Sequence, residues 1–443
     1  MSATIGPLRR TTALTAGPAR PRLVDRLARW IALRLLRGLQ GAQIVIREGQ
    51  ERHVLGQPNA EDPLLAVIEV HSPRFYTALL RGSLGLCESY MDGLWDCEDL
   101  VALTRVAARN VRSLDELRRV LWPILIPLQR GLRWLNRNTP GRARKRIAAH
   151  YDLGNELFSL FLDPTMSYSC AIFDTPKTTL EEASLNKLER VCSKLQLTQE
   201  DHLLEIGTGW GGFAIYAAEH YGCRVTTTTI SREQHVYATE RVEAAGLGER
   251  VTVLLKDYRE LSGTYDKLVS IEMIEAVGWQ HFNTFFRRCS ALLEDHGAML
   301  LQAIVIDDRA YHVEKASKSF INTYVFPGGC LPSMGVISRS IARVTDLRQV
   351  QLEDITEHYG ETLARWRSRF LDSRERLSEL GYDERFRRLW ELYLCYCEGG
   401  FRERRIQDVQ LLLAKPGYRS EPDLSAVLSK QTQPPRRKIL AGA

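Results

Sequence analysis

The stretch Asp201–Gly212, DHLLEIGTGWGG, constrains the fold of this chain more than any other. An apolar run that carries an acid at Glu205 gives way to a glycine-rich turn, Gly207–Gly212, and Phe213–Tyr221 then has the composition of a helix. Glycine lets the backbone take positive φ angles and approach a ligand closely, and a helix that begins after such a turn offers unpaired N–H groups. The stretch therefore predicts a strand, a glycine turn that can bind a ligand, and a helix.

The turn alone leaves its ligand open, because a dinucleotide, S-adenosylmethionine and a purely structural tight turn all suit a glycine-rich segment. A carboxylate just before the first glycine, here Glu205, suits a ligand with a cationic amino acid end, and S-adenosylmethionine is such a ligand. The next strand ends at Thr229 instead of the Asp or Glu that usually binds the ribose of a dinucleotide. These features favour S-adenosylmethionine over the other two interpretations.

From residue 147 onward, short β-branched runs alternate with helical segments, which predicts a mostly parallel sheet with helices on both faces. The expected strands after the first are 225–230, 251–256, 266–272 and 298–306, and the expected helices are 213–221, 233–245 and 281–293. In such a fold the ligand lies beyond the carboxyl ends of the strands. The residues that follow the strand ends are Gly207–Gly212, Thr229, Ile230, Ser231, Asp257, Tyr258 and Glu275.

The length of 443 residues suits two domains. We expect a leader at 1–22, an N-terminal α+β domain at 23–135, a basic linker at 136–146, the α/β domain at 147–425 and a basic tail at 426–443. Within the N-terminal domain we expect a helix at 23–39, strands at 43–47 and 64–70 with a turn at 56–63 between them, and a helix at 74–80.

The cysteines and the charge narrow the class of protein. The nine cysteines lack metal-ligand spacing, so we expect no metal site and a reducing, cytosolic setting. No apolar run approaches the roughly 20 residues that span a bilayer. The net charge of +6 gathers near both termini and in the linker, without the aromatic interleaving of a nucleic-acid surface.

Two basic apolar segments, Leu23–Leu39 and Val120–Leu135, admit two interpretations. A basic amphipathic helix with a Trp can lie in an anionic membrane interface, or it can pack on its own domain with a solvated Arg face. The residues alone leave the two equally supported.

Several candidate site residues could have a structural role instead of a functional one. Asp257 suits a helix cap, and Glu275 suits either a proton-handling acid or half of a structural pair. Cys170 and Cys397 resemble ordinary core cysteines. His150-Tyr151-Asp152 suits a helix entry better than a metal cluster.

An ordered set of motifs resembles the cyclopropane-fatty-acyl-phospholipid synthases and the related mycolic acid cyclopropane synthases. It comprises HYDLGNELFSLFLDPTMSYSCAIF, LLEIGTGWGGFAIYAAEHYG, TTTTISREQ, DYRELSGTYDKLVSIEMIEAVG, YVFPGGCLPS, HYGETLARW and YCEGGFRERRIQDVQ, with GSLGLCESYMDGLW in the N-terminal domain. The resemblance implies a class I S-adenosylmethionine-dependent methyltransferase with an N-terminal lipid-binding domain, acting on unsaturated acyl chains of membrane phospholipid. It also implies a cytoplasmic protein at the inner membrane face, and this gives weight to the interfacial interpretation. The oligomeric state stays open, a homodimer included.

The resemblance also assigns site residues. Those implied to hold the cofactor are Tyr168, Ser169, Glu205, Gly207, Thr208, Gly209, Trp210, Gly211, Gly212, Thr229, Ile230, Ser231, Gln234, Asp257 and Tyr258. A bicarbonate ion is implied as general base, in a cradle of the Cys170 backbone, Glu275, Ile304 and Tyr359, and Cys397 matches the family's active-site cysteine.

The chain departs from that pattern near the implied base. Gln302 replaces the usual His, and Thr208 replaces a common Cys. Gln can hydrogen-bond an anion but cannot hold a positive charge beside it. We expect a cyclopropane product, formed when the proton leaves the transferred methyl, with a methylene- or methyl-branched chain as the alternative.

Overall fold

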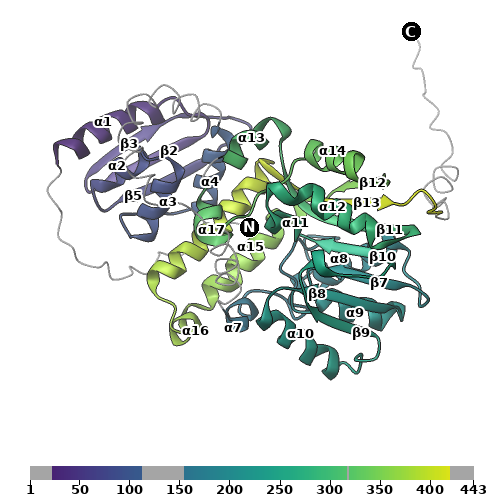
Figure 1. The fold of residues 1–443 in the computed structure, drawn as a ribbon. Coiled ribbons are helices and arrows are strands. Elements are labelled where there is room, and N and C mark those ends of the chain that lie inside the picture. The colour runs from purple at the N-terminus through teal and green to yellow at the C-terminus, as the bar shows by residue number, and fades with distance from the viewer. Residues whose placement is uncertain (1–21, 112–153, 317–318, 420–443) are drawn as a thin grey trace, which may run out of the picture.

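The computed structural model describes residues 22–111, 154–316 and 319–419, which form an N-terminal α+β region and a larger α/β region (Figure 1). The expected leader, the linker at 136–146, the segment 120–135, His150-Tyr151-Asp152 and the basic tail lie outside these residues. None of the described helices is long and apolar enough to cross a membrane.

The larger region is built on a seven-stranded sheet of order β12-β13-β11-β10-β7-β8-β9, in which β13 runs antiparallel to both neighbours. Its strands are β7 (His202–Ile206), β8 (Arg224–Thr229), β9 (Val251–Leu255), β10 (Tyr265–Ile271), β11 (Leu293–Ile306), β12 (Arg348–Asp354) and β13 (Ile406–Ala414). The predicted parallel arrangement of the first five strands is confirmed. The sequence analysis did not anticipate β12 and β13.

Helices cover both faces of this sheet, because successive strand residues point to opposite faces. Leu203 packs with Val191 and Phe213, whereas Leu204 packs in the cluster that contains Phe285. The helices are α7 (Asn155–Ser159), α8 (Leu180–Leu195), α9 (Gly212–Tyr221), α10 (Arg232–Ala244), α11 (Ile274–Val277), α12 (Phe282–Ala291), α13 (Asp308–Ala316), α14 (Met334–Val344), α15 (Thr356–Asp372), α16 (Arg374–Glu379) and α17 (Glu384–Arg402).

The N-terminal region contains a four-stranded sheet of order β3-β2-β5-β6, with the short pair β1 and β4 beside it. Its elements are α1 (Leu23–Leu36), β1 (Gln40–Gly41), β2 (Gln43–Glu48), β3 (Glu51–Leu55), β4 (Gln57–Pro58), β5 (Leu65–Val70), α2 (Arg74–Leu79), α3 (Ser83–Met91), β6 (Trp95–Cys97) and α4 (Leu100–Arg109). The expected turn at 56–63 therefore contains β4, and the expected first helix ends at Leu36 instead of Leu39.

The two regions are packed together through α17, which lies with α15 between the two sheets (Figure 1). The Thr104 hydroxyl on α4 donates to the Cys395 carbonyl at 2.8 Å, and the Arg105 and Arg109 guanidinium groups both bind the Glu403 carboxylate. One hydrophobic cluster runs from α1 through α4 to α17. The N-terminal region therefore has a fixed position relative to the carboxyl ends of the strands.

Candidate active site at the carboxyl ends of the strands

The glycine turn lies between β7 and α9, as predicted. Gly207, Gly209 and Gly211 have φ angles of 109°, 52° and 85°, which side chains rarely allow. A Cβ at Gly212 would lie 2.4 Å from the Thr165 carbonyl oxygen, so that glycine is required by packing. A Cβ at Gly209 would meet no atom within 4 Å. Gly209 therefore faces open space, which is the room that a ligand on this turn needs.

Glu205 lies behind this turn. Its carboxylate accepts a 2.6 Å hydrogen bond from the Thr227 hydroxyl, which is 2.7 Å from the Thr208 hydroxyl. Burial raises the pKa of Glu205 to about 8, although the Thr227 bond and the charge of Lys187 both oppose this. The acid thus supports the turn from inside the core, and its contact with a cofactor stays a prediction.

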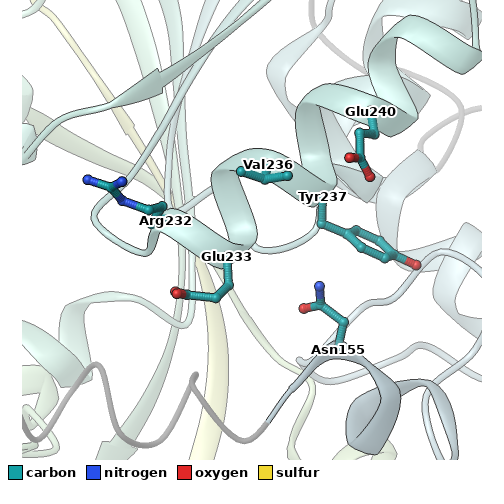
Figure 2. Close-up of a pocket in the computed structure, with 6 residues that line it drawn as sticks. All are labelled: Asn155, Arg232, Glu233, Val236, Tyr237 and Glu240. Carbon is teal, nitrogen blue, oxygen red and sulfur yellow. The ribbon is translucent and has the colours of Figure 1, made fainter.

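The residues after β8 are arranged around the start of α10. The Thr229 hydroxyl donates to the Gln234 side-chain oxygen at 2.9 Å, and Ser231 caps the helix by accepting from the Gln234 backbone N–H. The apolar side chain of Ile230 is 60% exposed. An open pocket of about 330 Å³ lies between α7 and α10 (Figure 2). Its lining residues are Asn155, Arg232, Glu233, Val236, Tyr237 and Glu240.

After β9, Asp257 caps a short 3₁₀ helix, Tyr258–Glu260, by accepting from the Arg259 backbone N–H at 3.0 Å, and it also binds the Arg259 guanidinium. The Tyr258 ring makes an edge contact with Phe285 at 5.6 Å between centroids. The structural explanation of Asp257 is thus confirmed, and its contact with an adenine ring stays a prediction.

The segment before α8 brings Tyr168 and Ser169 to the same edge. The Tyr168 hydroxyl is 2.8 Å from that of Tyr393, and Ser169 accepts a 3.0 Å hydrogen bond from the Lys187 ammonium. Trp210 of the turn is buried and donates to the Asn155 side chain at 2.7 Å. The turn is thereby tied to α7.

A half-buried carboxylate that the sequence analysis overlooked lies at the carboxyl end of the central strand β10. Glu272 directly follows β10, and its carboxylate accepts from the Cys170 backbone N–H at 2.8 Å, the Gln302 amide at 2.8 Å and the Tyr359 hydroxyl at 2.5 Å. Burial raises the pKa of Glu272, while these donors and the charge of Lys187 oppose the shift.

Glu275 lies beside Glu272 on α11. One carboxylate oxygen accepts from the Ile304 backbone N–H at 2.5 Å, and the other is inaccessible to solvent and has no hydrogen-bond partner in the described part of the chain. Burial, and then the charge of Glu272, raises the pKa of Glu275 to about 8. An acid with an inaccessible, unpaired oxygen and a pKa near neutrality is typical of a proton-handling group.

The Gln302 side chain links Glu272 to a third acid, Asp408. Its amide nitrogen donates to both Glu272 and Asp408, and its oxygen accepts from Gln410 at 3.0 Å. The pKa of Asp408 is raised well above its usual value by burial and by the charges of Glu272 and Glu275. The Gln that replaces the family's His is therefore a fully bonded bridge between two carboxylates.

The two cysteines assigned by resemblance are protonated thiols. Burial raises the pKa of Cys170 well above its usual value and that of Cys397 to about 12. A nucleophilic cysteine needs a lowered pKa. Cys170 contributes its backbone N–H to the site, and among the residues that the structure describes none lowers the pKa of the Cys397 thiol.

The sheet order, the single antiparallel strand β13 and the glycine turn after β7 define a class I S-adenosylmethionine-dependent methyltransferase. A solved mycolic acid cyclopropane synthase, in complex with SAH and CTAB, shares this fold with a TM-score of 0.57 and 30% identity, over 61% of this chain and 98% of that one. The open space at Gly209 and the exposed Ile230 fit such a cofactor.

The family follows from the sequence matches. The mycolic acid cyclopropane synthetase family model matches residues 138–411, and the chain belongs to this family of S-adenosylmethionine-dependent methyltransferases that modify fatty acyl chains. Tuberculostearic acid methyltransferase of Mycobacterium tuberculosis is 40% identical over 81% of this chain and 85% of its own length. Cyclopropane-fatty-acyl-phospholipid synthase of Escherichia coli strain K12 is 38% identical over 79% and 88%.

The geometry of the turn makes a prediction about cofactor affinity. Gly209→Ala is expected to weaken S-adenosylmethionine binding about tenfold or more in calorimetric titration, because the new methyl enters the open space beside the turn. Gly246→Ala is the matched control, since Gly246 also has a positive φ (69°) and open surroundings but lies beyond α10. Equal affinities in the two variants would contradict the assignment of this turn.

Proposed function

We propose that the protein transfers the methyl carbon of S-adenosylmethionine to the cis double bond of unsaturated acyl chains in membrane phospholipid. The observation that carries the proposal is the pair of half-buried carboxylates, Glu272 and Glu275, that follow β10 on the same sheet edge as the glycine turn. Alkylation of a double bond leaves a carbocation that must lose a proton, and this pair supplies proton acceptors. Methylation of a hydroxyl or an amine also releases a proton, so the choice of an acyl double bond is supported by the similarity to relatives that act on fatty acyl chains.

When bound, S-adenosylmethionine supplies an electrophilic methyl group, and the chain's own residues do the rest. The reactive intermediate must be kept from water, which a closed aromatic environment achieves. Tyr168 lies 5.2 Å from the Phe158 ring and 5.3 Å from the Trp366 ring, measured between centroids. Tyr359 stacks on Phe401 at 4.2 Å. Trp366 also packs against the Tyr359 ring, so aromatic side chains cover one of the donors to Glu272.

Three products are possible, depending on which proton leaves and whether a hydride migrates first. Loss from the transferred methyl closes a cyclopropane ring, the product expected from the sequence, and the similarity to the Escherichia coli synthase supports it. Migration of a hydride along the chain before that loss gives a methylene branch, and loss from a neighbouring chain carbon gives a methyl-branched alkene. The similarity to tuberculostearic acid methyltransferase and the presence of Gln302 favour a branched product as the second candidate.

The test uses purified protein with vesicles of dioleoyl phosphatidylglycerol and, as the control, vesicles of a saturated phosphatidylglycerol. We expect release of S-adenosylhomocysteine, matched by gain of one carbon in the acyl chain, with the unsaturated lipid alone. Equal turnover on the saturated lipid, or turnover without a change in the acyl chain, would refute the proposal.

Substrate in a bilayer requires a docking surface, and we assign it to α1. The inner face of this helix buries Asp25, Ala28, Ala32 and Leu36, whereas the apolar side chains of Leu23, Leu27 and Trp30 point outward and are 83%, 58% and 61% exposed. A group of large apolar side chains left exposed on one face of a helix is typical of an interaction surface. Exposed Arg26, Arg34 and Arg37 flank them and suit anionic headgroups.

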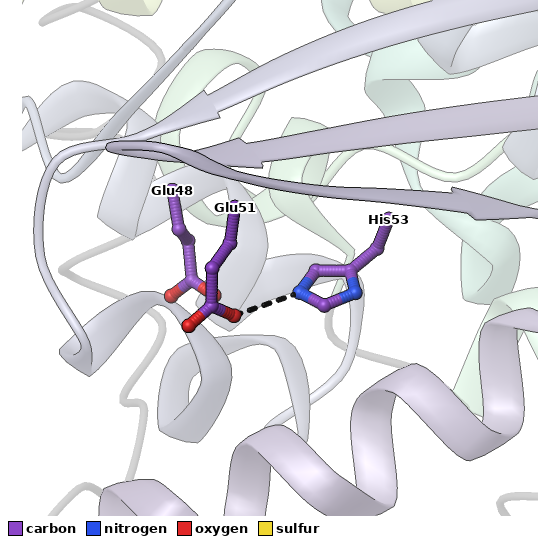
Figure 3. Close-up of side chains that lie close together, drawn as sticks. All are labelled: Glu48, Glu51 and His53. Carbon is purple, nitrogen blue, oxygen red and sulfur yellow. Dashed lines mark ion pairs between the residues drawn. The ribbon is translucent and has the colours of Figure 1, made fainter.

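A separate arginine fixes this helix on the sheet. Arg29 donates to Glu48 at 2.7 Å and to Glu51 at 2.5 Å, and its guanidinium lies 2.8 Å from the His53 ring nitrogen. Glu48, Glu51 and His53 lie close enough together to resemble a metal site (Figure 3). The guanidinium already supplies the positive charge there, so the cluster anchors α1 and leaves its other arginines for the lipid.

Replacing the outward apolar residues is expected to weaken membrane binding. The double variant Leu27→Ser, Trp30→Ser should bind anionic vesicles at least about tenfold more weakly in co-sedimentation, because each full-size apolar side chain buried in the interface stabilises binding by up to roughly 1.5–3 kcal/mol. Val54→Ser with Leu65→Ser, at two half-exposed positions of the N-terminal sheet, is the control that should leave binding unchanged. Unaltered binding of the α1 variant would exclude this surface.

A further inference from the structure

The Glu272 carboxylate is held by hydrogen bonds from several separate parts of the chain. Its carboxylate accepts from three segments that are distant in sequence: the backbone N–H of Cys170, the hydroxyl of Tyr359 on α15 and the side-chain amide of Gln302 on β11. Each of these contacts places a donor on an oxygen atom, which favours an anion at this position.

These donors coincide with those that the family resemblance implies for a bicarbonate ion. The expected cradle used the Cys170 backbone, Tyr359, Ile304 and Glu275. In the structure the first two bind the Glu272 carboxylate, and the Ile304 N–H is bound to Glu275. A carboxylate and a bicarbonate present the same planar, anionic O–C–O group. The described residues therefore leave no free donor set for bicarbonate, and this ion does not fit the site.

The backbone at Glu272 supports a functional role. Its φ angle is 49°, a left-handed conformation that costs roughly 1–2 kcal/mol for a residue with a Cβ. Its own N–H is held by the Gln302 carbonyl at 2.8 Å, so the conformation is fixed by the β10–β11 pairing. A side chain held in a strained backbone at the carboxyl end of a central strand is typical of active sites.

We infer that Glu272 is the general base of this enzyme and takes the place of a bound bicarbonate. The inference rests on the proposed alkylation of an acyl double bond. After that step one C–H bond of the alkylated chain breaks, its proton forms an O–H bond with a Glu272 oxygen, and its electron pair closes the ring or forms the new double bond. No oxidant or reductant is required. Glu272 is left as a neutral acid and returns the proton to solvent before the next turnover.

The neighbouring groups support this cycle. Burial raises the pKa of Glu272, and a carboxylate with a raised pKa is a stronger base than a surface carboxylate. Gln302 and Tyr359 keep the oxygens in place in both protonation states, since a hydroxyl can also accept a hydrogen bond. Lys187, buried nearby, keeps the resting site from being wholly anionic.

The test compares the wild type with Glu272→Gln and Glu272→Gly in carbon dioxide-free buffer, with and without added sodium bicarbonate, on dioleoyl phosphatidylglycerol vesicles. We expect the wild-type rate to be independent of bicarbonate. Both variants should lose about 100-fold or more of that rate while retaining S-adenosylmethionine affinity in calorimetry. Bicarbonate should partly restore Glu272→Gly, whose side chain no longer fills the cradle, and should not restore Glu272→Gln.

Gln196→Gly is the matched control, because Gln196 also has a left-handed φ (52°) but lies at the end of α8. It should keep the wild-type rate. A wild type that requires bicarbonate, a Glu272→Gln variant with a normal rate, or a Glu272→Gly variant without rescue would each overturn the inference and leave the proposed function standing. A wild type that alkylates no lipid under either condition would instead overturn the proposed function, and the inference with it.

Discussion

Glu275→Gln is expected to lower methyl transfer by about 100-fold or more while S-adenosylmethionine affinity stays near that of the wild type. The substitution keeps the shape of the side chain and an oxygen that can accept from the Ile304 N–H. It removes the acid with the unpaired oxygen beside Glu272. Gln cannot exchange protons, so Glu272 loses the neighbouring acid that can relay its proton toward solvent, Glu275 releasing its own proton before it accepts that of Glu272.

The same variant should change how stability depends on pH. The pKa of Glu275 is raised from 4.5 to about 8, so the folded chain binds the proton more tightly than the unfolded chain. The stability that this proton provides is complete below pH 4.5 and is lost as the pH rises through about 8. In Glu275→Gln the decline of the free energy of unfolding over this interval should be shallower, as measured by urea denaturation. A variant with a normal rate and an unchanged pH dependence would contradict the role given to this acid.

Lys187→Met is expected to lower the free energy of unfolding by about 3–5 kcal/mol. Lys187 is 2% exposed, donates to Ser169 and lies within the electrostatic influence of Glu272, Asp163 and Glu205. Its removal leaves these buried acids without their neighbouring cation. The pKa of Glu272 should then rise further, and the acidic limb of the pH–rate profile should move to higher pH.

Lys415→Met is the control for the lysine. The Lys415 side chain is only 10% exposed and also binds a carboxylate, that of Asp346 at 2.9 Å, but it lies at the end of β13 away from the acids of the site. We expect a smaller loss of stability, about 1 kcal/mol, and no shift of the pH–rate profile. An unshifted pH–rate profile in Lys187→Met, as in the control, would show that Lys187 acts only on stability.

The sequence predicted the part of the fold that depends on local patterns. The run from Leu203 to Ile206, followed by glycines, could form little other than a strand and a turn, and the structure places them there. β3 and β6 were not predicted, because ERHVL is mostly polar and WDC is too short for a periodic signal. β12 and β13 likewise carry no turn or ligand motif to mark them.

The site was predictable where residues adjoin strand ends and not where distant segments converge. Glu272 was overlooked although it follows an apolar strand three residues before Glu275, the same signal that identified Glu275. Its partners Cys170 and Tyr359 lie 102 and 87 residues away. Only the folded chain brings these donors to one carboxylate and shows that the expected bicarbonate cradle is filled.

The central claim is that the methyl carbon of S-adenosylmethionine becomes part of an acyl chain. The most direct measurement supplies trideuteromethyl S-adenosylmethionine with dioleoyl phosphatidylglycerol vesicles and analyses the fatty acids by mass spectrometry and proton NMR. We predict one added carbon with two deuteriums for a ring or a methylene branch, separated by the upfield cyclopropane signals, or with three for a methyl-branched alkene. Acyl chains without the labelled carbon, in the presence of cofactor turnover, would contradict the account.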